Sequence, residues 1–207
     1  MLDKGHVGVD ESGKGDYFGP LVVAACYVGP EHLAELEGVV DSKKLTDLQA
    51  LRLGSVIKRF CPHAVVVVGP AKYNELYAKI GNLNKLLAWG HARAIEDVLA
   101  KVQCDHVISD QFADPAGLRR ALMQKGSQVR LESRVRAEAD IAVAAASVLA
   151  RAAFLRRLKE LGEQWEMVLP KGAGPNVDHA ARAFVARKGR DNLGSVAKLH
   201  FKTTQKI

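Results

Sequence analysis

Five carboxylates in this sequence stand where the strands of a sheet are expected to end. Asp10 and Glu11 are adjacent and close a short apolar segment near the start of the chain. Asp110 closes a later apolar segment, and Glu138 and Asp140 come just before an alanine-rich stretch. When helices connect the strands of a sheet, strand ends meet at one edge, so carboxylates distant in sequence can lie together there. Glu138 and Asp140 are alternatives for the last position of such a cluster.

A cluster of this kind has a definite chemistry. Neighbouring negative charges repel one another and raise the pKa of at least one carboxyl group. A divalent cation such as Mg²⁺ or Mn²⁺ removes that conflict, because it prefers oxygen ligands. Two such ions, about 3.5–4 Å apart, activate a water and stabilise the leaving oxygen when a phosphodiester is cut. Acidic residues after strands also serve as helix caps or turn residues, and the pattern alone leaves that interpretation open.

The loop after Glu11 adds small residues and exposed backbone N–H groups beside the carboxylates, through Ser12, Gly13, Lys14 and Gly15. Glycine lets a main chain approach a ligand closely. The ribose 2′-hydroxyl, which distinguishes RNA from DNA, is a natural partner for such amides. The same residues would also make an ordinary hairpin turn, so the loop alone decides nothing.

The chain is basic, with 30 Lys and Arg residues against 23 Asp and Glu residues and a formal net charge of +7. This balance favours a polyanionic partner, although many basic proteins only have solvated charged faces. The position of the charges strengthens the hypothesis, because basic residues are concentrated in the last forty residues. They are Lys171, Arg182, Arg187, Lys188, Arg190, Lys198, Lys202 and Lys206.

Several protein classes are not supported. No apolar run approaches the roughly 18–20 residues that span a bilayer, and no secretory signal opens the chain. Cys26, Cys61 and Cys104 are odd in number and lack metal-ligand spacing, so we expect buried free thiols. We therefore expect a cytoplasmic protein without a membrane partner.

The order of apolar segments predicts alternating strands and helices and hence a mixed sheet. Strands are expected over residues 6–10, 20–28, 64–68, 106–110 and 127–135. Helices are expected over residues 46–59, 82–102, 141–161 and 177–187. The short gap between the first two strands indicates an antiparallel hairpin. The β-branched run 64–68 is typical of a strand covered on both faces, and Thr46 is a suitable helix N-cap. Trp89 and His91 lie on or near an apolar helical stripe, so we expect both to pack in the core.

Seven motifs give the chain a resemblance to a known family. The first reads Asp-Glu-Ser-Gly-Lys-Gly-Asp-Tyr-Phe-Gly-Pro over residues 10–20 and resembles the opening motif of the type 2 ribonuclease H superfamily. Its Asp-Tyr-Phe-Gly-Pro ending is similar to the ribonuclease HIII branch. The other motifs cover residues 41–45, 82–91, 109–112, 142–151, 169–174 and 200–206, so the resemblance spans nearly the whole chain. It implies an α/β chain with a ribonuclease H-like fold, a mixed five-stranded sheet flanked by helices.

The resemblance also implies roles for the acids. Asp10 and Glu11 match the first two catalytic, metal-binding acids, and Asp110 matches the third. The fourth acid of the branch is a glutamate in a basic-Ala-Glu stretch, which Glu138 fits. The spacing from Glu138 to the next helix is about one residue shorter than in the family, so Asp140 stays open as the alternative ligand.

Other matched residues are implied to contact an RNA–DNA hybrid. Ser12, Gly13, Lys14 and Gly15 match the loop near the scissile ribose. Lys43, Lys44 and Lys171 match positions that touch phosphates, and Lys43 could instead organise the acidic cluster. The ribonuclease HII branch has Gly-Arg-Gly in the loop and recognises single-ribonucleotide junctions, whereas this chain has Gly-Lys-Gly.

Together these features predict an endoribonuclease that uses Mg²⁺ or Mn²⁺ to hydrolyse the RNA strand of hybrids, leaving 5′-phosphate and 3′-hydroxyl ends. We expect residues 1–207 to form one catalytic domain and the protein to be a monomer. Ribonuclease HIII proteins usually carry a TATA-binding-protein-like domain ahead of this core, whereas here the motif begins within ten residues of Met1. Three alternatives are a junction enzyme of the ribonuclease HII kind, another metal-dependent nuclease or integrase that cuts DNA, and a non-catalytic hybrid-binding module.

Overall fold

A five-stranded mixed sheet forms the centre of the computed structural model, which describes residues 4–110 and 115–207 apart from the side chain of Glu138. The strands are β1 (His6–Ser12), β2 (Leu21–Val28), β3 (His63–Val68), β4 (His106–Asp110) and β5 (Arg130–Arg134), in the order β3-β2-β1-β4-β5. The β1–β2 and β2–β3 pairs are antiparallel, while β1–β4 and β4–β5 are parallel. The predicted mixed sheet and its opening hairpin are confirmed.

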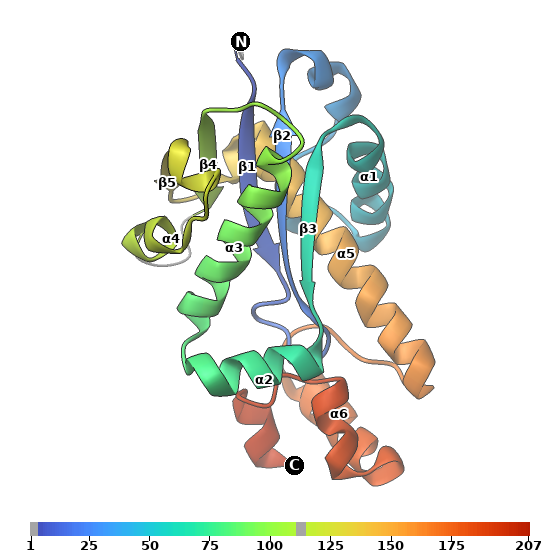
Figure 1. Ribbon diagram of the computed structural model, residues 1–207. Helices are drawn as coiled ribbons and strands as arrows, with labels where there is room; N and C mark the ends of the chain where they lie inside the picture. Colours follow the sequence, from blue (N-terminus) through green and yellow to red (C-terminus); the bar gives the residue numbers. More distant parts are fainter. Residues whose placement is uncertain (1–3, 111–114) are drawn as a thin grey trace.

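Helices cover both faces of this sheet. They are α1 (Asp47–Phe60), α2 (Pro70–Ile80), α3 (Leu83–Leu99), α4 (Pro115–Ala121), α5 (Ile141–Trp165) and α6 (Pro175–Lys188). Short 3₁₀ helices are η1 (Pro30–Leu36), η2 (Ser42–Lys44), η3 (Gly126–Gln128), η4 (Ala137–Ala139), η5 (Arg190–Ser195) and η6 (Lys202–Lys206). Figure 1 shows α3 across one face and α5 with α1 on the other, while α2, α6 and the C-terminal segment lie at one end.

Strand β1 sends alternate residues to the two helical layers, because successive side chains of a strand point to opposite faces. Val7 and Val9 belong to the apolar cluster that α3 covers. Gly8 faces α5 instead, and a Cβ atom built on it would lie 2.1 Å from the backbone nitrogen of Val143. The missing side chain therefore lets the start of α5 lie directly against the middle of β1.

The helix starts follow local sequence rules. Thr46 caps α1, as the sequence predicts, by accepting the backbone N–H of Gln49. The Gln49 side chain in turn accepts the backbone N–H of Thr46. The Asn82 side chain caps α3 by accepting the backbone N–H of Lys85, so the helix predicted over 82–102 begins one residue later. It ends at Leu99, three residues earlier than predicted.

Two predictions about burial need correction. Strand β3 has α3 on one face and α5 on the other, as predicted, but it is an edge strand and its burial is incomplete, since Val67 is 38% exposed. Trp89 is not packed in the core but is 39% exposed on α3. The sequence pattern does not predict helices α2 and α4, because both are short and weakly periodic. No helix in the described ranges combines the length and apolar character needed to cross a membrane.

The close approach at Gly8 gives a test of this packing. We predict that Gly8→Ala lowers the free energy of unfolding by about 3 kcal/mol or more, because the added methyl meets backbone that cannot rotate away. Gly117→Ala is the matched control, since its Cβ atom would meet nothing within 4 Å and alanine favours the helix. Urea denaturation of both variants measures the difference, and equal stabilities would contradict the packing described.

Candidate active site

The carboxylates Asp10 and Asp110 come together because β1 and β4 are parallel neighbours. Val9 pairs with Ser109 in the register of these strands, so the next residues, Asp10 and Asp110, lie side by side at the strand ends. Asp10 is on the α5 face, where the Ser147 hydroxyl bonds its carboxylate. Burial raises the pKa of Asp10, and the negative charges of Glu11 and Asp110 raise it further, against the opposing effect of Ser147.

Glu11 points to the opposite face and has two nitrogen partners. Its Oε1 accepts a hydrogen bond from Lys14 Nζ at 2.8 Å, and its Oε2 lies 3.0 Å from Nε2 of His91 on α3. Burial raises the pKa of Glu11, but the hydrogen bonds and charges of His91 and Lys14 outweigh burial and hold that pKa below its ordinary range. Glu11 is therefore ionised beside an Asp10 whose charge is costly.

Asp110 is fixed by the turn that follows β5. One oxygen of its carboxylate accepts the backbone N–H of Ala137 at 3.1 Å. Ala137 begins η4, whose middle residue is Glu138. The hydrogen bond thus places the backbone of residue 138 next to the end of β4, while the Glu138 side chain lies outside the described atoms.

These carboxylates open into one cavity with a volume of about 300 Å³. It is lined by Asp10, Glu11, Ser12, Gly13, Lys14, Gly15, Ser42, Lys43, Asp110, Ser147 and Arg151. The structure therefore brings together three predicted acids, the whole predicted loop and one predicted lysine. Among the described side chains, no group of three or more His, Cys, Asp or Glu is close enough to hold one ion unaided.

Asp140 has a different environment from the other acids. Its carboxylate caps α5 by accepting the backbone N–H groups of Ala142 and Val143, at 3.0 and 3.2 Å. Both of its oxygens also lie 2.8 Å from Nε2 of the buried His6. Burial raises the pKa of Asp140, but the His6 contact and the two N–H groups lower it overall. Asp140 is not among the residues that line the cavity.

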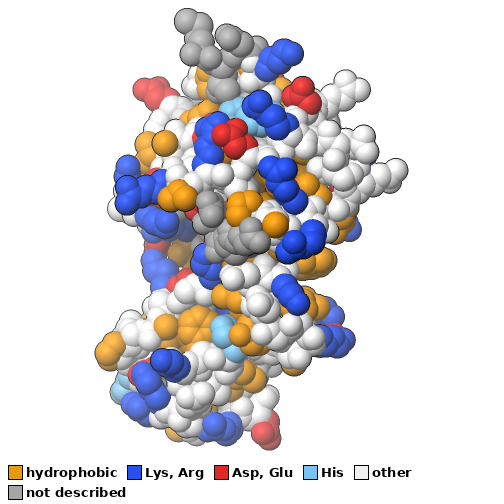
Figure 2. Space-filling view, turned by 90° about the vertical axis from the view of Figure 1, so that its left-hand side faces the viewer, with side chains coloured by type: hydrophobic (Ala, Val, Ile, Leu, Met, Phe, Trp, Pro, Cys, Tyr) orange, Lys and Arg blue, Asp and Glu red, His pale blue; other side chains and the backbone are white. Residues whose placement is uncertain are grey.

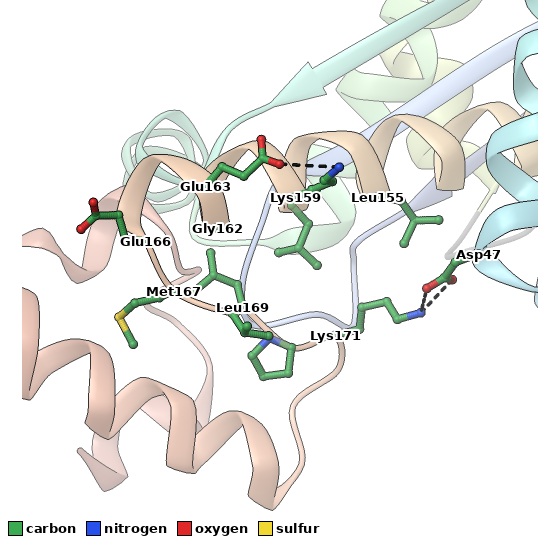
Figure 3. Close-up of a pocket in the computed structure, with 12 residues that line it drawn as sticks. Asp47, Leu155, Lys159, Gly162, Glu163, Glu166, Met167, Leu169 and Lys171 are labelled. Atoms are coloured by element: carbon green, nitrogen blue, oxygen red, sulfur yellow. Dashed lines mark hydrogen bonds and ion pairs between the residues drawn. The ribbon is translucent and has the colours of Figure 1, made fainter.

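The predicted phosphate-binding lysines are in different positions. Lys43 lines the cavity, whereas Lys44 and Lys171 do not. Figure 3 shows Lys171 at a second, more apolar cavity of about 560 Å³, with its amine directed at Asp47. The Lys171 nitrogen is 2.6 Å from Oδ2 of Asp47, and Oδ1 of Asp47 accepts a hydrogen bond from Arg151. A phosphate at Lys171 would have to share that lysine with Asp47.

The residues that follow the Ser12–Gly15 loop are held in place by the C-terminal part of the chain. Gly13 has φ +87°, and a Cβ atom there would lie 2.2 Å from the carbonyl oxygen of Pro20, so this position requires glycine. Lys198 is fully buried, and its ammonium donates to the carbonyl oxygens of Asp16 and Gly19 at 2.6 and 2.7 Å. Burial lowers the pKa of Lys198 to about 7, against the opposing charge of Asp16. Lys198 thereby fixes the backbone of Asp16 and Gly19, directly after the cavity-lining residues Ser12–Gly15.

Comparison with known proteins identifies relatives of this chain. The family model described as "Ribonuclease HII" matches residues 7–204. The ribonuclease HIII of Protochlamydia amoebophila is 46% identical over 98% of this chain and 68% of its own length, and that of Chlamydia pneumoniae is 46% identical over 98% and 70%. The crystal structure of Bst-RNase HIII in complex with Mn²⁺ superposes with a TM-score of 0.92 at 35% identity, over 100% of this chain and 70% of that one.

The chain belongs to the ribonuclease HIII branch of the type 2 ribonuclease H family.

The sequence alone does not reveal the roles of three residues that contact or support the site of this ribonuclease H chain. His91 was expected to be a core residue, and it is buried, but it touches Glu11. Ser147 binds Asp10 and also lies 2.8 Å from Ser42 Oγ, so it joins η2 to the acids. Lys198 was counted only among the basic residues of the C-terminal region. The sequence feature that points to a site role for His91 is a titratable residue on an otherwise apolar helix face.

Proposed function

We propose that this chain hydrolyses the RNA strand of RNA–DNA hybrids and leaves 5′-phosphate and 3′-hydroxyl ends. The observation that carries the proposal is one cavity lined by Asp10, Glu11 and Asp110 and bordered by the Ser12–Gly15 loop. Acids and exposed backbone amides are needed at the same place if a phosphodiester next to a ribose is to be cut. Membership of the ribonuclease HIII branch supports the same activity.

Asp10, Glu11 and Asp110 have the donor chemistry that suits a divalent cation. Their donors are all oxygen, the set that Mg²⁺ and Mn²⁺ prefer, and Asp10 carries a charge that its neighbours disfavour. The relative solved in complex with Mn²⁺ supports the same choice of ion. When bound, the ions would supply Lewis-acid activation of water and stabilisation of the leaving oxygen.

The residues of the chain itself have separate tasks in this proposal. Ser147 and the Ala137 N–H group orient Asp10 and Asp110. The backbone of Ser12 to Gly15 binds the ribose at the cut. Lys43 and Arg151 line the cavity and attract the phosphates on either side of it.

Binding of a long hybrid requires basic surface beyond this cavity. Figure 2 shows Lys and Arg side chains spread over one face of the molecule, with few Asp and Glu side chains among them. Each phosphate neutralised by such a residue releases counterions and contributes to binding. The net charge of +7 is in keeping with a polyanionic substrate.

Glu138 is the fourth metal ligand in this proposal, rather than Asp140. The carboxylate of Asp140 already has four short contacts, two with helix N–H groups and two with His6. A carboxylate used as a helix cap is not available to an ion in a cavity that it does not line. The hydrogen bond from Ala137 to Asp110 holds the turn that carries Glu138 against the catalytic strand end.

The alternatives receive less support. A non-catalytic hybrid-binding module would not need three carboxylates in one cavity. A junction enzyme of the ribonuclease HII kind is disfavoured by Gly-Lys-Gly in place of Gly-Arg-Gly. We also propose one catalytic domain over residues 1–207, a monomer, and a cytoplasmic location, the last because Cys26, Cys61 and Cys104 are free thiols.

Cleavage assays test the activity. With Mg²⁺ or Mn²⁺, we expect cuts in the RNA strand of a matched RNA–DNA hybrid, weaker cleavage at a single-ribonucleotide junction, and none in a DNA–DNA duplex. Chelation and Asp10→Asn should each abolish cleavage, because both remove the cation from the acids. Cleavage of the DNA duplex, or cleavage that survives chelation, would contradict the proposal.

The choice of fourth acid has its own test. Glu138→Gln should reduce the rate of hybrid cleavage more than about a hundredfold, since even groups behind the metal ligands contribute about 10–100-fold. Asp140→Asn should retain cleavage but lower the free energy of unfolding by about 1–2 kcal/mol, because the His6 contact loses its charge. Single-turnover kinetics and urea denaturation on both variants separate the effects. Loss of cleavage in Asp140→Asn alone would show that the assignment is wrong.

A further inference from the structure

His91 is the only fully buried histidine among the described residues, and both of its ring nitrogens have polar partners. Nε2 lies 3.0 Å from Oε2 of Glu11, and Nδ1 lies 3.2 Å from Oγ of Ser109. Burying an imidazole costs free energy unless its nitrogens form hydrogen bonds. The two contacts therefore offset the cost of burying His91 in this position. Because an ionised carboxylate has only acceptors, Nε2 carries the hydrogen in the contact with Glu11.

The partners of His91 belong to the two strand ends that carry the acids. Glu11 is the penultimate residue of β1, while Ser109 precedes Asp110 in β4 and donates from its Oγ to the Asp110 carbonyl oxygen at 3.0 Å. His91 thus reaches from α3 between these strands, on the face opposite to Ser147. The helix is held close here, since a Cβ atom on Gly90 would lie 2.9 Å from a methyl carbon of Val23.

The two oxygens of Glu11 have unequal partners. Oε2 faces the buried His91, which cannot leave without moving α3. Oε1 faces Lys14, whose side chain is 43% exposed and which lies in a loop that borders the cavity. An exposed lysine can give up such a contact at little cost, whereas a buried histidine cannot.

We propose that His91 is a positioning residue for metal binding: it holds Glu11 Oε2 so that Oε1 is presented to the cation, and Lys14 occupies Oε1 until the cation arrives. This inference rests on the proposed function, because it assumes that Glu11 is a metal ligand. Hydrogen bonds to metal-ligating carboxylates typically contribute 10–100-fold to metal affinity or activity.

Three substitutions at His91 separate positioning from packing. Glutamine places its amide nitrogen near the position of Nε2 and keeps a donor for Glu11. Asparagine places its amide near Nδ1 and keeps only the contact with Ser109, and leucine removes both. Leu87→Val is the matched control, since Leu87 is fully buried on the same helix and packs in a cluster without the acids.

Mn²⁺ binding to the nucleic-acid-free full chain, measured by isothermal titration calorimetry, is the deciding readout. We expect His91→Asn and His91→Leu to weaken Mn²⁺ binding about 10–100-fold, and His91→Gln and Leu87→Val to stay within about threefold of wild type. The Mg²⁺ concentration for half-maximal hybrid cleavage should rise in the same order. Thermal unfolding of each variant records the packing cost separately.

Equal Mn²⁺ affinity for His91→Gln and His91→Asn would overturn the inference, as would wild-type affinity in His91→Leu or no Mn²⁺ binding by the wild type. If His91→Leu does not fold, the difference in Mn²⁺ affinity between His91→Gln and His91→Asn still tests the inference. Wild-type protein that binds Mn²⁺ but does not cleave hybrids would refute the proposed function. The Mn²⁺ affinities of the His91 variants would still test the role of His91.

Discussion

Asp10 lies near the end of β1 beside two other carboxylates. Burial and the negative charge of Glu11 raise its pKa, and Asp110 at the end of the parallel neighbour β4 adds to the rise, so Asp10 carries a charge that its surroundings disfavour. Much of the surrounding structure can be understood from this conflict. Donors converge on the acids from several directions, with the Ser147 hydroxyl on Asp10 and the Ala137 N–H on Asp110. A fold retains such a costly arrangement when a cation completes it, as in other sites built from oxygen ligands.

The sheet divides the acids between two helical layers. Asp10 faces α5, while the next residue, Glu11, faces α3, because the side chains of a strand alternate. Both helices must therefore lie close to the sheet and in fixed positions. Gly8 allows this for α5 and Gly90 for α3. Gly8 lies two residues before Asp10, and Gly90 directly precedes His91, which contacts Glu11.

The sequence predicts those parts of the site that local rules determine. The acids at strand ends, the opening hairpin and the Thr46 cap follow from spacing and residue type, and the motifs identify the family. Burial was harder to predict, because Trp89 and His91 have the same helical surroundings in sequence but opposite exposure in the structure. The pairing of Lys171 with Asp47 joins residues 124 positions apart, and no local pattern encodes it.

The central claim is that the acids at the ends of β1 and β4 form one divalent-cation site. Anomalous diffraction from a crystal soaked in Mn²⁺ tests it most directly. We predict a manganese peak within coordination distance, about 2.0–2.6 Å, of oxygens from both Asp10 and Asp110. Well-ordered acids without such a peak, or manganese bound only at Asp140 and His6, would contradict it.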